Sequence, residues 1–202
     1  MNSTPQHIVF DIGRVLIQYD AEIPFRRLIP DAEERRWFFA NVCTPAWNAE
    51  QDRGRSWSEA EAELIEQFPD HVDAIRAFRK YWHNMVPGEI VGSVEIMQAM
   101  LEQNRDVTLL TNFAADTFSE CLERFPFLNI TRGVTVSAEI GLIKPDAAIF
   151  NHHIESFGLV PAATLLIDDS ADNVASAIDT GWQAILFTGV ESLQSDLEKL
   201  GL

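Results

Sequence analysis

The most constraining feature of the sequence is a short apolar run near its start that leads directly into an acidic residue. Residues 7–12 place three apolar side chains ahead of Asp11, and Gly13 follows two positions later. A short run that is apolar on both faces is typical of a strand at the centre of a parallel sheet. In open α/β sheets, the carboxyl ends of the strands are where ligands bind. We therefore predict that Asp11 lies at the ligand-binding edge of a sheet.

Helical and strand-like patterns alternate through the second half of the chain. The expected helices cover residues 93–103, 114–125, 146–157, 171–180 and 191–200, and the expected strands cover residues 106–110, 133–136, 164–167 and 183–187. This alternation predicts an α/β fold, a Rossmann-like parallel sheet with helices on both faces. Thr111-Asn112 and Asp168-Asp169 follow two of the strands. Because the carboxyl ends of parallel strands share one edge, these residues should lie close to Asp11.

Residues 20–87 differ from the rest, because strand-like runs are absent and helical patterns follow one another. Asp31 can cap a helix whose Trp37 we expect to face a small core, and Ser58 has capping-box spacing to Glu61. The predicted organisation is a core domain made of residues 1–19 and 88–202, with residues 20–87 inserted as a small α-helical cap.

Charge excludes several classes of partner. The 202 residues include 31 acidic and 15 basic side chains, which gives a formal net charge of −16. Nucleic acids and anionic membranes both need a basic surface, so we expect neither as a partner. The same charge repels anionic substrates, so a phosphate site must carry local positive charge from a lysine, a metal ion or backbone N–H groups.

The two cysteines and the N-terminus bear on the compartment. Cys43 and Cys121 lack metal-ligand spacing, and we interpret both as buried thiols in a reducing compartment. The first residues lack a basic segment followed by an apolar run, and no apolar stretch approaches the roughly 18 residues of a membrane span. We therefore expect a cytoplasmic protein.

Four motifs in order resemble the haloacid dehalogenase-like (HAD) hydrolase superfamily. They are Phe-Asp-x-Gly-x-Val-Leu, Leu-Leu-Thr-Asn, Glu-Ile-Gly-Leu-Ile-Lys-Pro-Asp and Leu-Ile-Asp-Asp-Ser-x-x-Asn-Val. Each motif alone is a weak signal, but three of the four stand at predicted strand ends. The helical insert after the first motif is similar to the small α-helical cap of that superfamily. The resemblance covers essentially the whole chain.

The resemblance implies a role for each acidic residue. Asp11 would be a nucleophile that attacks the substrate and forms an aspartyl intermediate. Mg²⁺ would cancel the repulsion between this carboxylate and a phosphate, with Asp11, the Gly13 carbonyl and Asp169 as ligands. Asp168 would reach the metal through water or orient its surroundings, and Asn173 would support the site from behind.

The remaining motif residues would bind the substrate. Lys144 would bridge the nucleophile and the phosphate as a fixed cation. The Thr111 hydroxyl, together with the backbone N–H or the amide of Asn112, would hold the phosphoryl oxygens. Outside the motifs, the insert could present a polar and aromatic stretch to a substrate, namely Trp47, Asp52, Arg53, Arg55 and Trp57. Asp20 lies near the predicted hinge, where contact with substrate and a capping role are both open.

The sequence departs from the common phosphatase pattern at Gly13. Most phosphatases of this superfamily carry an aspartate there, which protonates the leaving group and later activates water. Arg14, the next residue, cannot act as a general acid at neutral pH. The Phe-Asp-x-Gly-x-Val form resembles a subgroup that includes sugar-phosphate phosphatases. We hypothesise that a sugar 1-phosphate suits such a site, because its anomeric oxygen leaves more easily than an ordinary alkoxide.

Three functions remain open at this point. We favour Mg²⁺-dependent hydrolysis of a small phosphorylated metabolite through an aspartyl-phosphate, because paired acids such as Asp168 and Asp169 make sense around a cation. A 2-haloacid dehalogenase also lacks the second aspartate, since a halide leaves without a proton, but it needs no metal. A phosphate-binding protein with little catalysis is the third alternative. The sequence leaves the substrate and the oligomeric state open.

Overall fold

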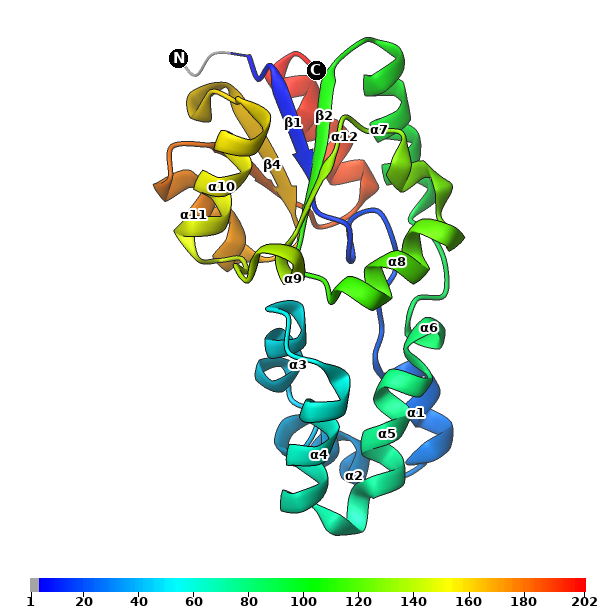
Figure 1. Ribbon diagram of the computed structural model, residues 1–202. Helices are drawn as coiled ribbons and strands as arrows, with labels where there is room; N and C mark the ends of the chain where they lie inside the picture. The colour runs from blue at the N-terminus through cyan, green and yellow to red at the C-terminus, as the bar shows by residue number, and fades with distance from the viewer. Residues whose placement is uncertain (1–3) are drawn as a thin grey trace.

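A computed structural model describes residues 4–202, so residues 1–3 of the predicted core segment 1–19 lie outside it. Within the described residues, the strands form one parallel sheet in the order β3-β2-β1-β4-β5. Their bounds are β1 His7–Phe10, β2 Asp106–Thr111, β3 Val134–Val136, β4 Thr164–Asp168 and β5 Gln183–Leu186. Strand β1 is central, and the apolar run at the start of the sequence is therefore buried in the middle of the sheet (Figure 1).

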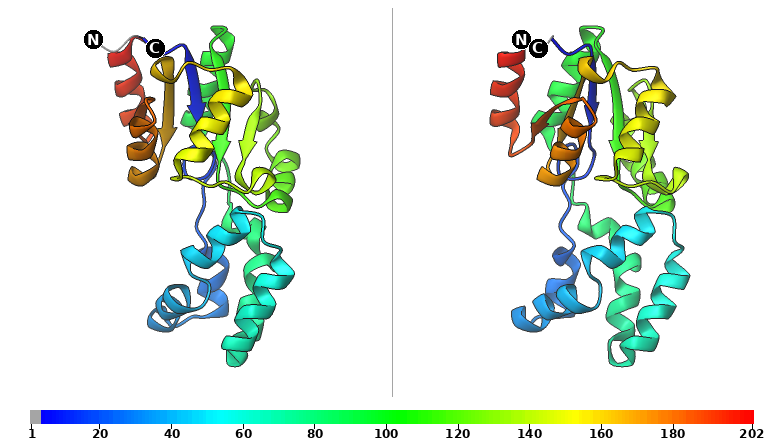
Figure 2. Two further views of the ribbon diagram at one scale, coloured as in Figure 1. Left: turned by 60° about the vertical axis from the view of Figure 1, so that its left-hand side comes forward. Right: turned by 90° about the vertical axis from the view of Figure 1, so that its left-hand side faces the viewer.

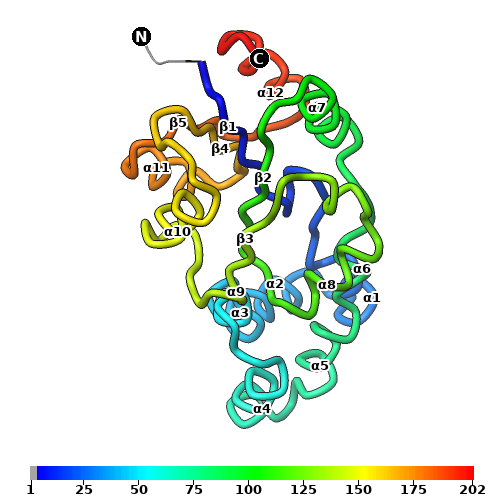
Figure 3. Tube along the Cα trace, turned by 45° about the horizontal axis from the view of Figure 1, so that its top comes forward, coloured from blue at the N-terminus to red at the C-terminus, as the bar shows by residue number. Residues whose placement is uncertain are grey.

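Helices cover both faces of this sheet, as the alternating pattern predicts. Helices α10 and α11 lie on one face, while α7 and α12 lie on the other (Figure 3). The helices after residue 90 are α7 Val91–Glu102, α8 Ala115–Arg124, α9 Ser137–Ile140, α10 Ala147–Phe157, α11 Ala171–Asp179 and α12 Val190–Leu200, with the 3₁₀ helices η2 Pro126–Asn129 and η3 Pro161–Ala163. The observed fold class is thus the predicted α/β, Rossmann-like one.

The side chains of β1 divide between the two faces. Ile8 and Phe10 belong to the larger apolar cluster, which also contains Met97 of α7 and Leu193 of α12. Val9 belongs to a smaller cluster together with Phe150 of α10, among others. Successive residues of a strand point to opposite faces, so a run that is apolar throughout buries both. This packing fixes the strand end that carries Asp11.

A group of helices stands between β1 and α7 and lies below the sheet in Figures 1 and 2. Its helices are α1 Glu22–Leu28, α2 Ala32–Asn41, α3 Pro45–Asp52, α4 Trp57–Gln67, α5 Val72–Lys80 and α6 Trp82–Met85, with the 3₁₀ helix η1 Pro69–His71. Aromatic rings form much of its interior: Phe25 stacks on Phe38 at 5.4 Å, and Trp47 meets Phe78 edge-on at 5.3 Å. We keep 20–87 as the proposed extent of this insert.

The two chain segments that connect the insert to the core run side by side. The backbone N–H of Gln18 donates to the carbonyl of Gly88, and that of Asp20 donates to the carbonyl of Met85, each at 2.8 Å. These bonds tie the entry and exit of the insert into a short ribbon. The insert also touches the core through α3, which packs against α9.

Two local expectations for the insert are wrong. The box that opens α4 is Ser56–Glu59 rather than Ser58–Glu61: the Ser56 hydroxyl accepts from the backbone N–H of Glu59. Both pairs have the same spacing, and the helix begins two residues earlier than predicted. Trp37 is 43% exposed, although Phe38 beside it is buried, so the apolar stripe of α2 is narrower than the sequence indicates. Asp31 does cap α2, as predicted.

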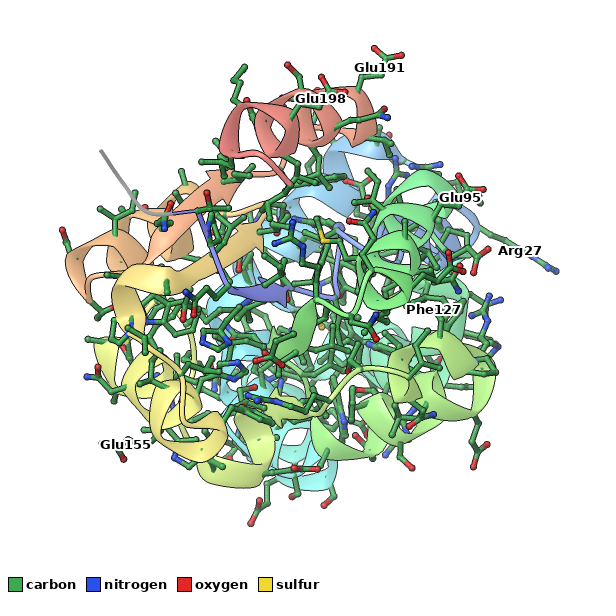
Figure 4. The ribbon with its side chains drawn as sticks, turned by 90° about the horizontal axis from the view of Figure 1, so that it is seen from above. Arg27, Glu95, Phe127, Glu155, Glu191 and Glu198 are labelled. Carbon is green, nitrogen blue, oxygen red and sulfur yellow. The ribbon has the colours of Figure 1, made fainter. Side chains whose placement is uncertain are left out.

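The surface carries the acidic excess, and labelled side chains such as Glu155, Glu191 and Glu198 point away from the molecule in Figure 4. Cys43 and Cys121 are buried free thiols, as expected. In the stretch from residue 4 to residue 202, no helix combines the length and the apolar character needed to cross a membrane.

Candidate active site

Asp11 follows the last residue of β1 and is held at the sheet edge by backbone bonds. Its N–H donates to the carbonyl of Ile167 on β4 at 2.9 Å, and its carboxylate accepts from the N–H of Ile12 at 2.7 Å. The residue is only 7% exposed. The backbone of Asp11 is therefore held between two neighbouring strands, and its carboxylate is held by the N–H of the residue that follows it.

Lys144 reaches this carboxylate from the loop before α10. Its ammonium is 3.0 Å from Asp11 Oδ1 and 2.6 Å from Asp168 Oδ2, and it donates to the carbonyl of Leu110 at 3.0 Å. Burial alone would lower the pKa of Lys144, but the negative charges of Asp11 and Asp168 outweigh it and raise that pKa above its usual value. Lys144 is thus a fixed, charged cation between two acids.

Asp168, the last residue of β4, is completely buried and has several donors. Besides Lys144, its oxygens accept from the side-chain amide of Asn173 at 2.9 and 3.1 Å and from the N–H of Ser170 at 2.9 Å. Asn173 lies in the first turn of α11, whose cap is Ser170. These bonds leave Asp168 oriented toward Lys144.

The acids form a cluster that suits a hard cation. Oxygen atoms of Asp11, Asp168 and Asp169 lie within 4.8 Å of one another. Three carboxyl groups thus share a largely buried space in which the Lys144 ammonium contacts two of them. Burial raises the pKa of Asp11 to about 7, with Asp168 adding to the rise and Lys144 opposing it. Carboxylate oxygens are the ligands that Mg²⁺ prefers, so the donor set fits that ion.

The outer side of this cluster meets a cleft. Asp169 is partly exposed, and its carboxylate is 3.9 Å from the guanidinium of Arg14. Arg14 adopts a positive φ of 58°, which turns the chain directly after Gly13. Burial, and next the charge of Asp168, raise the pKa of Asp169. Gly13, Arg14 and Asp169 all line the cleft.

Thr111, the last residue of β2, and Asn112, which follows it, differ in their hydrogen bonding. Thr111 is 1% exposed, and its hydroxyl makes no hydrogen bond within the described part of the chain. The Asn112 amide, in contrast, is engaged with the backbone of Lys144: it donates to that residue's carbonyl at 2.9 Å and accepts from its N–H at 2.8 Å. The sequence suggests that Asn112 holds a phosphoryl oxygen through either its backbone N–H or its side-chain amide. The amide is already bonded to Lys144.

The cleft has a volume of about 210 Å³ and lies between the sheet edge and the insert. Besides Asn112, Gly13, Arg14 and Asp169, its lining residues are Tyr19, Asn48, Asp52, Trp57, Trp82, Phe113 and Thr117. The lining is thus aromatic on several sides and polar near the acid cluster.

The insert residues singled out from the sequence separate into two groups. Asp52 and Trp57 line the cleft, whereas Trp47 is 8% exposed in the interior of the insert. Arg53 and Arg55 do not line the cleft. They form ion pairs with other residues: Arg53 with Glu50 and Asp146, and Arg55 with Glu63.

Asp20 does not line the cleft either. It accepts a hydrogen bond from the N–H of Glu22 at 2.9 Å and pairs with Arg26 at 2.8 Å, which favours the capping alternative. Tyr19, Trp82 and Phe113 were not singled out as cleft residues. These residues come together only because the insert packs against the sheet edge, and no local sequence pattern predicts that contact.

The fold and this site define a hydrolase of the HAD type, and the sequence agrees. The pattern of haloacid dehalogenase-like hydrolases matches residues 51–187, more than half of the chain. The protein therefore belongs to that family. The matched residues include Thr111, Lys144 and both acids at the end of β4. Asp11 precedes the matched residues, and it belongs to the same site because its carboxylate contacts Lys144.

Curated relatives of this chain include a flavin mononucleotide hydrolase and a sesquiterpene phosphatase. Flavin mononucleotide hydrolase 1 of Arabidopsis thaliana is 26% identical over 113 residues, which are 55% of this chain and 45% of that protein. A sesquiterpene phosphatase of Aspergillus oryzae is 26% identical over 103 residues, 51% of this chain and 52% of that protein. The matched region thus spans about half the length of these relatives.

Solved structures share the fold over almost the whole chain. A HAD-like hydrolase from Porphyromonas gingivalis has a TM-score of 0.76 at 21% identity, covering 98% of both chains. A HAD family enzyme from Bacteroides thetaiotaomicron in complex with magnesium and inorganic phosphate has a TM-score of 0.70 at 20% identity, covering 92% of this chain and 95% of that one. The L-2-haloacid dehalogenase of Xanthobacter autotrophicus has a TM-score of 0.66 at 15% identity, covering 96% of this chain and 83% of that one.

Proposed function

We propose that this hydrolase is a Mg²⁺-dependent phosphatase that removes phosphate from a small phosphorylated metabolite through an aspartyl-phosphate intermediate. The observation that carries the proposal is the contact between Asp11 and Lys144 beside a cluster of further carboxylates. A carboxylate that attacks a phosphate needs positive charge on the same side, and a dehalogenase has no use for additional acids.

In this proposal Asp11 is the nucleophile. One of its oxygens bonds to phosphorus while the bond from phosphorus to the ester oxygen breaks, and the ester oxygen takes a proton and leaves as an alcohol. Water then attacks the aspartyl-phosphate, which releases inorganic phosphate and restores the carboxylate. Lys144 and the Thr111 hydroxyl hold the phosphoryl oxygens, together with the backbone N–H of Asn112.

Asp11, the Gly13 carbonyl and Asp169 would hold the Mg²⁺ ion. When bound, the ion supplies positive charge against the phosphoryl group. Asp168 is engaged with Lys144 and Asn173, so we assign it to the support of the site, with any contact to the ion made through water. This arrangement uses every acid of the cluster.

The relatives support the reaction class. One is named a flavin mononucleotide hydrolase and another a sesquiterpene phosphatase, and the Bacteroides enzyme of the same fold was solved in complex with magnesium and inorganic phosphate. A cleft of about 210 Å³ favours a small substrate. A sugar phosphate is one candidate, and glucose 1-phosphate compared with glucose 6-phosphate tests whether the leaving oxygen must be anomeric. A clear preference for the 6-phosphate would contradict the anomeric hypothesis.

The test is phosphate release from a panel of phosphomonoesters with and without Mg²⁺. We expect release that depends on the ion and is lost in Asp11→Asn but kept in Asp179→Asn, an exposed acid at the end of α11. Full release by Asp11→Asn would refute the nucleophile assignment. Halide release from 2-chloropropionate without metal would favour a dehalogenase, and phosphate binding without turnover would favour a binding protein.

A further inference from the structure

Asp52, the last residue of α3, places a carboxylate from the insert on the wall of the cleft. Several contacts hold it there. Asn48 donates its amide to Asp52 Oδ2 at 3.2 Å, the Ser137 hydroxyl donates to the Asp52 carbonyl, and the backbone N–H of Ala114 lies close enough to the carboxylate to lower its pKa. Ala114 and Ser137 belong to the core, so Asp52 is fixed where the insert meets the sheet edge.

The acids of the cleft have different assignments. Among the described lining residues, the acids are Asp52 and Asp169, and Asp169 belongs to the proposed metal site. No hydrogen bond or ion pair within residues 4–202 joins Asp52 to Asp11 or Asp169. Asp52 is therefore the acid that faces the substrate space without a place in the cation cluster.

The surroundings of Asp52 favour a carboxyl that exchanges protons near neutral pH. Burial raises its pKa to about 7; the Ala114 N–H opposes the rise, and the charge of Asp11 adds to it. The other titratable groups that line the cleft are Arg14, Tyr19 and Asp169.

Arg53, the residue next to Asp52 in the chain, does not neutralise it. The guanidinium of Arg53 lies 3.8 Å from Glu50 and 3.3 Å from Asp146. The nearest cationic neighbour in sequence is thus paired with other acids, and the carboxyl of Asp52 keeps the proton affinity that its burial gives it.

We propose that Asp52 donates the proton to the leaving oxygen, in place of the carboxylate that Gly13 cannot provide. The inference rests on the phosphatase function proposed above. As the bond between phosphorus and the ester oxygen breaks, the Asp52 carboxyl gives its proton to that oxygen, which leaves as a neutral alcohol. The resulting carboxylate then takes a proton from the water that attacks the aspartyl-phosphate. Asp52 is thereby protonated again, and the cycle closes.

If Asp52 is the proton donor, its loss should slow substrates with poor leaving groups more than substrates with good ones. Nitrophenolate leaves without a proton, whereas an alkoxide needs one. We expect Asp52→Asn to lower kcat/KM for benzyl phosphate about 100-fold or more, and for p-nitrophenyl phosphate less than about 10-fold. Asp52→Glu, which keeps a carboxyl, should recover part of the benzyl phosphate activity. Glu66→Gln removes an exposed acid of α4, elsewhere in the insert, and should leave both rates unchanged.

The pH profile gives a second readout that a structural role would not change. Because the donor must be protonated, the wild-type rate with benzyl phosphate should fall as the pH rises above about 7, and this fall should be absent with p-nitrophenyl phosphate. Equal losses on the two esters in Asp52→Asn, or the same pH profile for both in the wild type, would overturn the role of Asp52 alone. If the wild type released no phosphate from either ester, the phosphatase function itself would fail, and the role of Asp52 with it.

Discussion

The side-chain amide of Asn112 holds the backbone of Lys144 from both sides, with its oxygen on the Lys144 N–H and its nitrogen on the Lys144 carbonyl. The pair joins the end of β2 to the loop before α10. The two bonds fix the position of the Lys144 backbone, from which the ammonium reaches Asp11 and Asp168.

Replacing Asn112 by alanine should therefore weaken both stability and turnover. Loss of this pair leaves partly buried backbone groups without partners, and we expect the free energy of unfolding to fall by about 1–3 kcal/mol. Phosphate release should fall about tenfold or more, because Lys144 is no longer held. Urea denaturation and steady-state kinetics measure the two effects. Asn129→Ala, at an exposed position, is the matched control, and an equal effect there would contradict the role of Asn112.

Lys144→Met removes the cation between two buried acids. Breaking a buried ion pair costs about 3–5 kcal/mol, because the remaining charges are uncompensated. Added Mg²⁺ should raise the melting temperature of this variant by more than that of the wild type, since the acid cluster has lost the positive charge of Lys144. Thermal unfolding with and without Mg²⁺ measures the difference. The exposed Lys199→Met is the control; a variant as stable as the wild type without metal would count against this account.

Ser56 and Ser58 provide a test of which capping box opens α4. The Ser56 hydroxyl accepts from the N–H of Glu59, whereas Ser58 lies inside the helix. Loss of a capping hydroxyl costs about 1 kcal/mol, so Ser56→Ala should destabilise the protein by that amount. Ser58→Ala should change stability by less than about 0.5 kcal/mol. Chemical denaturation of both variants measures the two losses of stability. A larger loss in Ser58→Ala than in Ser56→Ala would restore the prediction made from the sequence.

His153 predicts how stability depends on pH. It is completely buried and bonded to the hydroxyls of Thr108 and Thr135, and burial lowers its pKa from 6.5 to about 3. Between these values the unfolded chain binds a proton that the folded chain does not. The stabilisation is therefore fully present above pH 6.5 and is lost as the pH falls, by about 2 kcal/mol between pH 7 and pH 5.

His153→Gln should remove this part of the pH dependence, because a glutamine does not titrate. His152→Gln, at the neighbouring position, should retain it. Urea denaturation of both variants at pH 7 and pH 5 gives the comparison. If the drop in stability were as large in His153→Gln as in the wild type, it would have to come from other groups.

The core was predictable because its signals are local. The central strands are short and largely apolar; Asp11 follows β1, while Thr111 ends β2 and Asp168 ends β4, so these three polar residues could be assigned to one edge from the sequence. Helix α3 was missed although Thr44 caps it and Pro45 occupies its first turn, a signal that could have located it. Helix α1 begins after Ala21, which has no capping side chain, and Pro24 lies within the helix, which obscures its pattern.

The roles of side chains in the insert could not be predicted in the same way. Asp52, Arg53 and Trp57 lie in one polar and aromatic stretch, and nothing in their spacing tells which of them faces the substrate space. That choice depends on how α3 packs against α9, a contact between residues distant in the sequence. Engagement of Asn112 with Lys144 is another long-range pairing that spacing does not reveal.

The ribbon that joins the insert to the core has a consequence for how such proteins diversify. Gln18 is bonded to Gly88, and Asp20 to Met85, so the chain leaves the core and re-enters it at almost the same point. A segment whose ends lie together can be exchanged for another of different length without separating the strands on either side. Selection can therefore replace the helices that shape the cleft while the acid cluster and its lysine stay in register, and new substrates become accessible without new chemistry.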